Sequence, residues 1–99
     1  MPLRIPTLIT HATMGLDTVE LVIALEEAYR VELPREDLVR VRTVADLFDV
    51  IATRTGRGLV GRYAGPEWED YRQRVSDELG VEIAKLAPMA RFLQDLGID

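Results

Sequence analysis

The block from Leu16 to Ile51 constrains this chain most, because it repeats the apolar spacing of short helices; it reads LDTVELVIALEEAYRVELPREDLVRVRTVADLFDVI. In its first part, Val22, Leu25 and Tyr29 recur at i, i+3 and i+7, with Leu21 beside them. This spacing places them on one stripe of a helix that faces a core. The block therefore predicts an amphipathic helix at its start.

A second set of residues lies mostly off that stripe. It gives the helix an acidic face with one apolar residue in its middle, and its members are Asp17, Glu20, Ile23, Glu26 and Glu27. Two interpretations stay open from the helical wheel alone: a surface for a basic partner, or the solvated side of an amphipathic helix.

Two further helices are predicted within the same block. Pro34 follows a short extended piece and begins a helical turn over residues 35–39. Thr43 has the character of an N-cap, with Asp46 three residues later. The helix that it opens should bury Val44, Leu47, Phe48 and Ile51.

Residues 1–15 are expected to form an extended arm, because Pro2 and Pro6 disfavour helix, and to pack Leu3, Ile5, Leu8 and Ile9 on the domain or a neighbour. The arm lacks the long apolar run of a signal peptide. His11 is the single histidine, and we interpret it as a capping or solvated residue.

Composition narrows the class of partner. The net charge of −5 argues against nucleic acid and anionic membranes, and permits partners with basic patches. The chain has no cysteine, so thiolate chemistry and disulfides are excluded. Its apolar runs are far shorter than the ~20 residues that span a bilayer. We therefore expect a cytoplasmic protein.

Residues 54–66 form a linker by composition, rich in glycine and arginine. The run from Gly56 to Gly61 also matches G-x-G-x-x-G, but a helix precedes it and no parallel-strand pattern occurs, so a dinucleotide site is rejected.

A further helix is predicted from Pro66, which suits the first helical position. Its buried stripe consists of Trp68, Tyr71, Val75 and Leu79, and Gly80 suits the residue after its end. A loop with apolar anchors follows; these are Val81, Ile83, Leu86, Met89, Phe92, Leu93, Leu96 and Ile98.

The block over residues 16–53 resembles an acyl carrier protein from its second helix through its fourth. The opening LDTVEL with ALEE, the Leu33-Pro34 step and the Thr43-Val44 helix start all fit without a gap. In that family an Asp-Ser pair stands before the position of Leu16, and its serine carries phosphopantetheine. Here Met14-Gly15 stands there, so the attachment serine is missing.

Residues 67–99 are also similar to an acyl carrier protein, but to its first helix and long first loop. The Leu79-Gly80-Val81 turn, the Ala90-x-Phe92 pair and Asp95-Leu96-Gly97-x-Asp99 fall at the family spacing. In the family, the serine follows the aspartate that Asp99 matches. The two halves therefore cover the carrier in reversed order and meet at one point, which makes the paired resemblance specific.

The resemblance implies an all-α fold, a carrier-like four-helix bundle in a single domain. Three arrangements explain the reversed order. The chain is a circular permutant joined by the linker, or two chains exchange their C-terminal helices in a homodimer, or the pieces are remnants of tandem carriers. The last is disfavoured, because half-covered apolar stripes would aggregate.

Little chemistry remains at the attachment position. Gly15 has no hydroxyl, and the resemblance places Asp99 beside it in space. The only serine, Ser76, lies mid-helix, and neither Thr13 nor Thr18 matches the modified position. No catalytic set, cofactor site or metal-ligand cluster is visible in the sequence, so we expect a protein that is not an enzyme.

Asp17, Glu20, Glu26 and Glu27 match carboxylates that dock on basic patches of synthases, transferases and reductases in the family, and Ile23 matches an apolar contact. The sequence therefore predicts a non-catalytic interaction module. Two alternatives stay open: a structural or oligomerisation domain with no acyl-pathway role, and a carrier with an atypical attachment residue.

Overall fold

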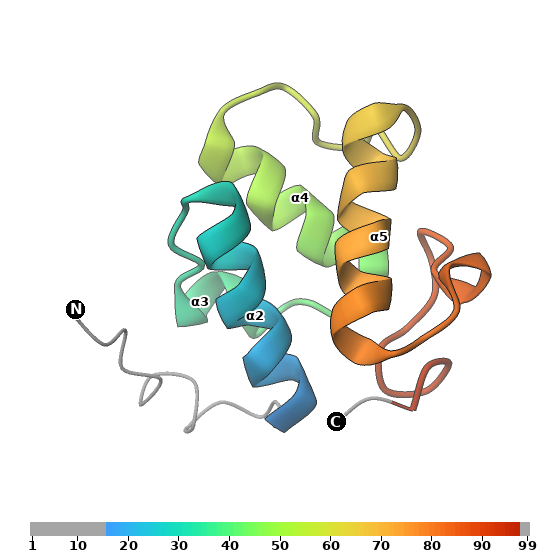
Figure 1. The fold of residues 1–99 in the computed structure, drawn as a ribbon. Coiled ribbons are helices and arrows are strands. Elements are labelled where there is room, and N and C mark those ends of the chain that lie inside the picture. The colour runs from blue at the N-terminus through green and yellow to red at the C-terminus, as the bar shows by residue number, and fades with distance from the viewer. Residues whose placement is uncertain (1–15, 98–99) are drawn as a thin grey trace.

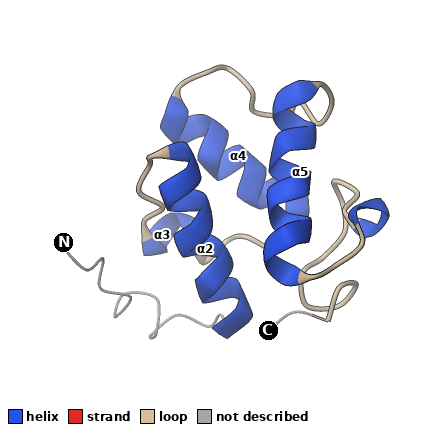
Figure 2. Ribbon diagram, viewed as in Figure 1, coloured by secondary structure: helices blue, strands red, loops and turns tan. Residues whose placement is uncertain are grey.

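The computed structural model describes residues 16–97, with side chains from residue 18. These residues form α2 (Leu16–Tyr29), α3 (Arg35–Leu38), α4 (Val44–Thr55), α5 (Pro66–Leu79) and a 3₁₀ helix, η1 (Ile83–Lys85). Within this range there is no strand, only an isolated bridge between Thr43 and Arg91 (Figure 2). The predicted all-α class is confirmed for the described part of the chain.

Helix α4 begins with the predicted cap. The Thr43 hydroxyl accepts a hydrogen bond from the Asp46 N–H at 3.0 Å, and the Asp46 carboxylate accepts the Thr43 N–H at 3.1 Å. The helix ends at Thr55, and Gly56 after it takes the left-handed conformation at φ 67° that glycine adopts without strain. All four apolar residues predicted for its buried side are buried.

The predicted linker is shorter than residues 54–66. Arg54 and Thr55 belong to the last turn of α4, and Pro66 is the first residue of α5. The Arg54 guanidinium binds the Asp37 carboxylate of α3 at 2.9 Å. Asp49 of α4 fixes the remaining linker to the helix. Its carboxylate accepts hydrogen bonds from the Gly61 N–H at 3.0 Å and from the Tyr63 hydroxyl at 2.6 Å.

Helix α5 packs against α2 and α4 of its own chain, and Figure 1 shows the three helices around a common interior. Trp68, Tyr71 and Val75 are buried there with Leu21 and Leu25 of α2. The core is held by burial of these apolar groups, at roughly 25 cal/mol per Å² removed from water.

Aromatic rings fill the space between α4 and α5. The Phe48 ring lies 5.1 Å from that of Trp68 and 5.2 Å from that of Tyr71, measured between centroids. The buried Tyr71 hydroxyl donates to the Val44 carbonyl oxygen at 2.7 Å. This bond satisfies a hydroxyl that would otherwise be costly to bury.

The loop after α5 pairs with the start of α4. Val44 and Ala45 donate their N–H groups to the carbonyl oxygens of Ala90 and Pro88, each at 2.9 Å. The first N–H groups of a helix have no acceptor within the helix, so the loop supplies the acceptors that α4 lacks. The Arg72 guanidinium holds the loop on its other side, through the carbonyl oxygens of Ile83 and Leu86.

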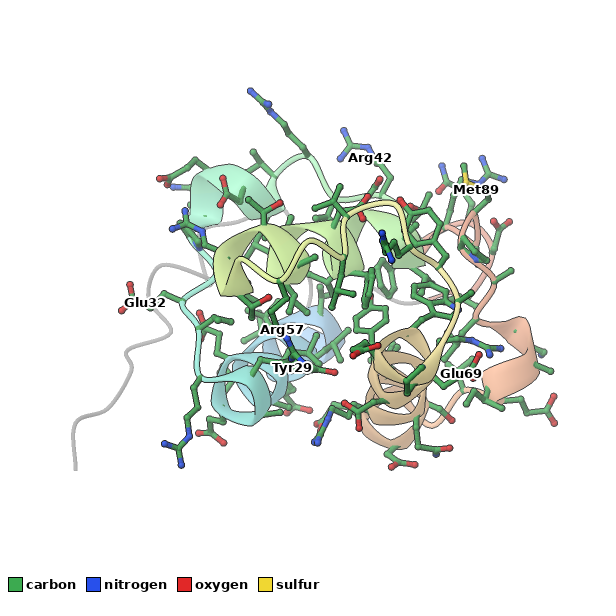
Figure 3. The ribbon with its side chains drawn as sticks, turned by 90° about the horizontal axis from the view of Figure 1, so that it is seen from above. Tyr29, Glu32, Arg42, Arg57, Glu69 and Met89 are labelled. Carbon is green, nitrogen blue, oxygen red and sulfur yellow. The ribbon has the colours of Figure 1, made fainter. Side chains whose placement is uncertain are left out.

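For two of the apolar residues predicted to anchor this loop, the prediction is wrong. Met89 and Leu93 are 73% and 60% exposed, whereas Leu86 and Phe92 are buried. Met89 points away from the ribbon in Figure 3. A loop of irregular backbone has no fixed side-chain period, so its apolar residues alone do not indicate which ones face the core. Ile98 lies outside the described residues.

Candidate functional site

The acidic face of α2 is only partly available to a partner. Glu20 and Glu27 are exposed, whereas Ile23 is half-buried and packs against the core. The side chain of Asp17 lies outside the described residues. Two exposed carboxylates, about two helical turns apart, are therefore the described groups best placed for contact with a basic surface.

Glu26 has a structural task that its place on the helical wheel did not indicate. It is half-buried, and its carboxylate accepts the Leu33 N–H at 2.8 Å. The chain between them turns sharply at Arg30, which has φ 56°. Because the bond spans seven residues through that turn, only the folded backbone reveals it. The sequence offers one local signal for this bond: Glu26 is an acidic residue in the last turn of a helix that is followed by an extended segment.

The C-terminal end of α2 is fixed to α5 by a three-residue contact. The Tyr29 hydroxyl donates to the Asp70 carboxylate at 2.8 Å, and Arg74 binds the same carboxylate at 2.9 Å. The Arg74 guanidinium also lies 5.5 Å from the centre of the Tyr29 ring, within the range of a cation–π contact. This contact orients α2, and with it the acidic face, relative to α5.

The same contact shifts the pKa values of Tyr29 and Asp70. Burial and then the Asp70 carboxylate raise the pKa of Tyr29 far above its ordinary value. Burial opposes ionisation of Asp70, but hydrogen bonds from Arg74 and Tyr29 outweigh it and hold the pKa of that carboxyl below its usual range. Asp70 is therefore ionised near neutral pH and Tyr29 is neutral.

Gly15 and Asp99, the pair predicted at the attachment position, lie outside the described residues, as do His11 and Thr13. Of the remaining hydroxyls considered, Ser76 lies within α5 and donates to the Val81 carbonyl oxygen at 2.7 Å. Thr18 is half-buried and also has an interaction partner. These contacts give Ser76 and Thr18 local roles in the helices.

No helix between residues 16 and 97 has the length and apolar character needed to cross a membrane. Over the same range, no three His, Cys, Asp or Glu side chains gather in a way that could hold a metal ion.

Comparison with known proteins shows similarity over part of the chain. Over 38 residues the chain is 62% identical to the acyl carrier protein of Syntrophobacter fumaroxidans (strain DSM 10017 / MPOB). The match covers 38% of this chain and 47% of the relative, so the chain spans about half the length of that curated protein. No protein-family profile matches the chain. No solved structure matches it either. The comparison thus supports the predicted relation to the acyl carrier protein family, over about two fifths of this chain.

Proposed function

We propose that this protein is a non-catalytic, carrier-like interaction module that docks through α2 on basic patches of carrier-handling enzymes. The observation that carries the proposal is the pair of exposed carboxylates, Glu20 and Glu27, on a helix whose sequence resembles the recognition helix of acyl carrier proteins. The similarity to a curated acyl carrier protein supports it. The module has no phosphopantetheine of its own, because Gly15 offers no hydroxyl for attachment.

We further propose that the carrier scaffold is circularly permuted and closes within one chain. The packing of Trp68 and Tyr71 beside Leu25 supports this arrangement, because α5 would be the carrier's first helix and α2 its second. Exchange of α5 between two chains would use the same contacts. Solution mass distinguishes the two: a monomer supports closure within the chain, and a stable dimer supports exchange.

Charge reversal at Glu20 and Glu27 should weaken binding to a purified ketoacyl synthase by about tenfold or more. Both side chains are exposed, so lysine fits at either position without repacking the core. Binding is measured at low salt, where attraction between surface charges is strongest. Glu26 is left unchanged, because its bond to Leu33 would confound the result.

The matched control reverses Glu78 and Glu82, two exposed carboxylates outside α2: Glu78 lies in the last turn of α5 and Glu82 at the N-cap of η1. It makes the same change in net charge and should retain binding. Equal losses in the two double variants would mean that net charge governs the association, and undiminished binding of the Glu20/Glu27 variant would exclude α2 as the docking surface.

Incubation with coenzyme A and a phosphopantetheinyl transferase should leave the intact mass of the protein unchanged. The reason is chemical: the transferase needs a serine hydroxyl at the start of the second carrier helix, and Gly15 stands there. An acyl carrier protein treated in parallel should gain one cofactor. A mass increase in this chain would establish the alternative of an atypical carrier.

The second candidate is an oligomerisation domain with no acyl-pathway role. Met89 and Leu93 favour it, because they leave large apolar side chains exposed on one loop. This candidate predicts a stable homodimer that is indifferent to the carboxylates of α2. Binding of the ketoacyl synthase that depends on Glu20 and Glu27 would exclude it.

A further inference from the structure

A pocket opens where the linker meets three helices, far along α2 from the start of its acidic face. Its volume is about 240 Å³. It is lined by Tyr29 near the end of α2, by the last turns of α4, by Arg57 and Leu59 of the linker, and by the first turns of α5. The linker thus forms part of the pocket wall, so the pocket depends on the connection between α4 and α5.

The floor of the pocket is apolar. Phe48, Ile51, Ala52 and Leu59 contribute side chains without charge or hydrogen-bonding groups. A dry cavity of roughly 150 Å³ holds a benzene molecule in another protein, so this volume suffices for one aromatic ring or branched aliphatic chain. It is below the roughly 300–1,000 Å³ of sites for drug-sized ligands. The occupant should therefore be a small molecule with one apolar group.

The rim carries one cation and one anion with unused binding capacity. An Arg57 nitrogen and a Glu67 carboxylate oxygen lie 3.9 Å apart, too far for a hydrogen bond, and the side chains are 56% and 42% exposed. An exposed ion pair of this kind contributes little to the stability of the fold, so a ligand can separate the two side chains at low cost. Arg57 and Tyr29, both labelled in Figure 3, line the same pocket.

The other polar groups of the wall are already engaged. Asp70 is bound by Arg74 and by the Tyr29 hydroxyl, and the Thr55 hydroxyl donates to the Ala52 carbonyl oxygen at 3.1 Å. Arg57 and Glu67 are therefore the groups that remain to recognise a polar ligand.

From this arrangement we propose that the pocket binds a small zwitterion with one apolar substituent, of the class of free apolar α-amino acids. The ligand carboxylate would bind the Arg57 guanidinium, its ammonium group would bind the Glu67 carboxylate, and its side chain would occupy the apolar floor. A ligand with a single charge would leave one of the two rim groups facing a like charge or an apolar atom.

The test is a titration of the full chain, followed through its backbone amide NMR signals. The probes are L-phenylalanine, phenylpropionate, which lacks the ammonium group, and phenethylamine, which lacks the carboxylate. We expect L-phenylalanine to shift amides of the pocket wall at millimolar concentration and to bind about tenfold more tightly than either analogue. Equal binding of one analogue, or no shift in the wall, would overturn the proposal.

Two variants assign the rim groups. R57Q and E67Q should each weaken L-phenylalanine about tenfold. R57Q should also raise the affinity for phenethylamine, because it removes a positive charge near the ligand ammonium group. E67Q should raise the affinity for phenylpropionate, because it removes a negative charge near the ligand carboxylate. The control R62Q changes an exposed arginine of the same linker that does not line the pocket, and it should leave all three affinities unchanged. Equal effects of R57Q and R62Q would contradict the assignment, and thermal midpoints verify that every variant is folded.

Discussion

Trp68→Ala should destabilise the protein by about 3–5 kcal/mol, the range found when a buried tryptophan or phenylalanine is truncated. Trp68 is only 3% exposed, and its ring centre lies 5.1 Å from that of Phe48 and 5.3 Å from that of Tyr63. Its removal would leave a cavity between α4, α5 and the linker. Since small domains are stable by only about 5–15 kcal/mol, this one change removes a large share of the total.

The measurement is urea unfolding followed by far-ultraviolet circular dichroism, because Trp68 is the only tryptophan and its fluorescence disappears in the variant. Gln73→Ala, on the exposed side of the same helix, should change stability by no more than about 0.5 kcal/mol. Equal destabilisation by the two changes would contradict the packing of α5. With closure in one chain, the midpoint should not vary with protein concentration, as it would for a dimer.

Raising the pH above 10 should unfold the protein and ionise its tyrosines in the same transition. All three tyrosines of the chain have raised pKa values. Burial raises the pKa of Tyr71 well above its ordinary value and, together with Asp70, that of Tyr29. The hydrogen bond to Asp49 is the main cause that raises the pKa of Tyr63 to about 12. The folded state therefore favours the neutral phenol at every tyrosine.

The direction of the effect follows from linkage. A group whose pKa is higher in the folded state contributes stability that is fully present below its unfolded pKa of about 10 and is lost as pH rises toward the folded pKa. Tyrosinate absorbance should therefore stay low through pH 10 and then rise as the helical dichroism disappears. The urea-unfolded chain should titrate near pH 10. A tyrosine that ionises near pH 10 while the helices persist would contradict the contacts described for it.

How well a contact can be predicted from sequence depends on how many residues separate the two groups that make it. The Thr43–Asp46 cap was found from sequence because both of its bonds are completed within four residues. The bond from Glu26 to Leu33 was missed because a turn of the backbone separates the two groups. Helical periodicity identified Glu20 and Glu27 correctly as exposed, but it placed Glu26 in the same surface set.

The sequence by itself determined the helices, their caps, most of the buried stripes and the resemblance to acyl carrier proteins, because these depend on residues within a turn or two of one another. Tertiary structure alone decided which helices share a core, how Asp49 and Asp70 tie distant segments together, and that the linker forms a pocket wall. The physical reason is that side chains far apart in sequence meet only after the backbone has folded. Their distances, and hence their charges and hydrogen bonds, are properties of that packing.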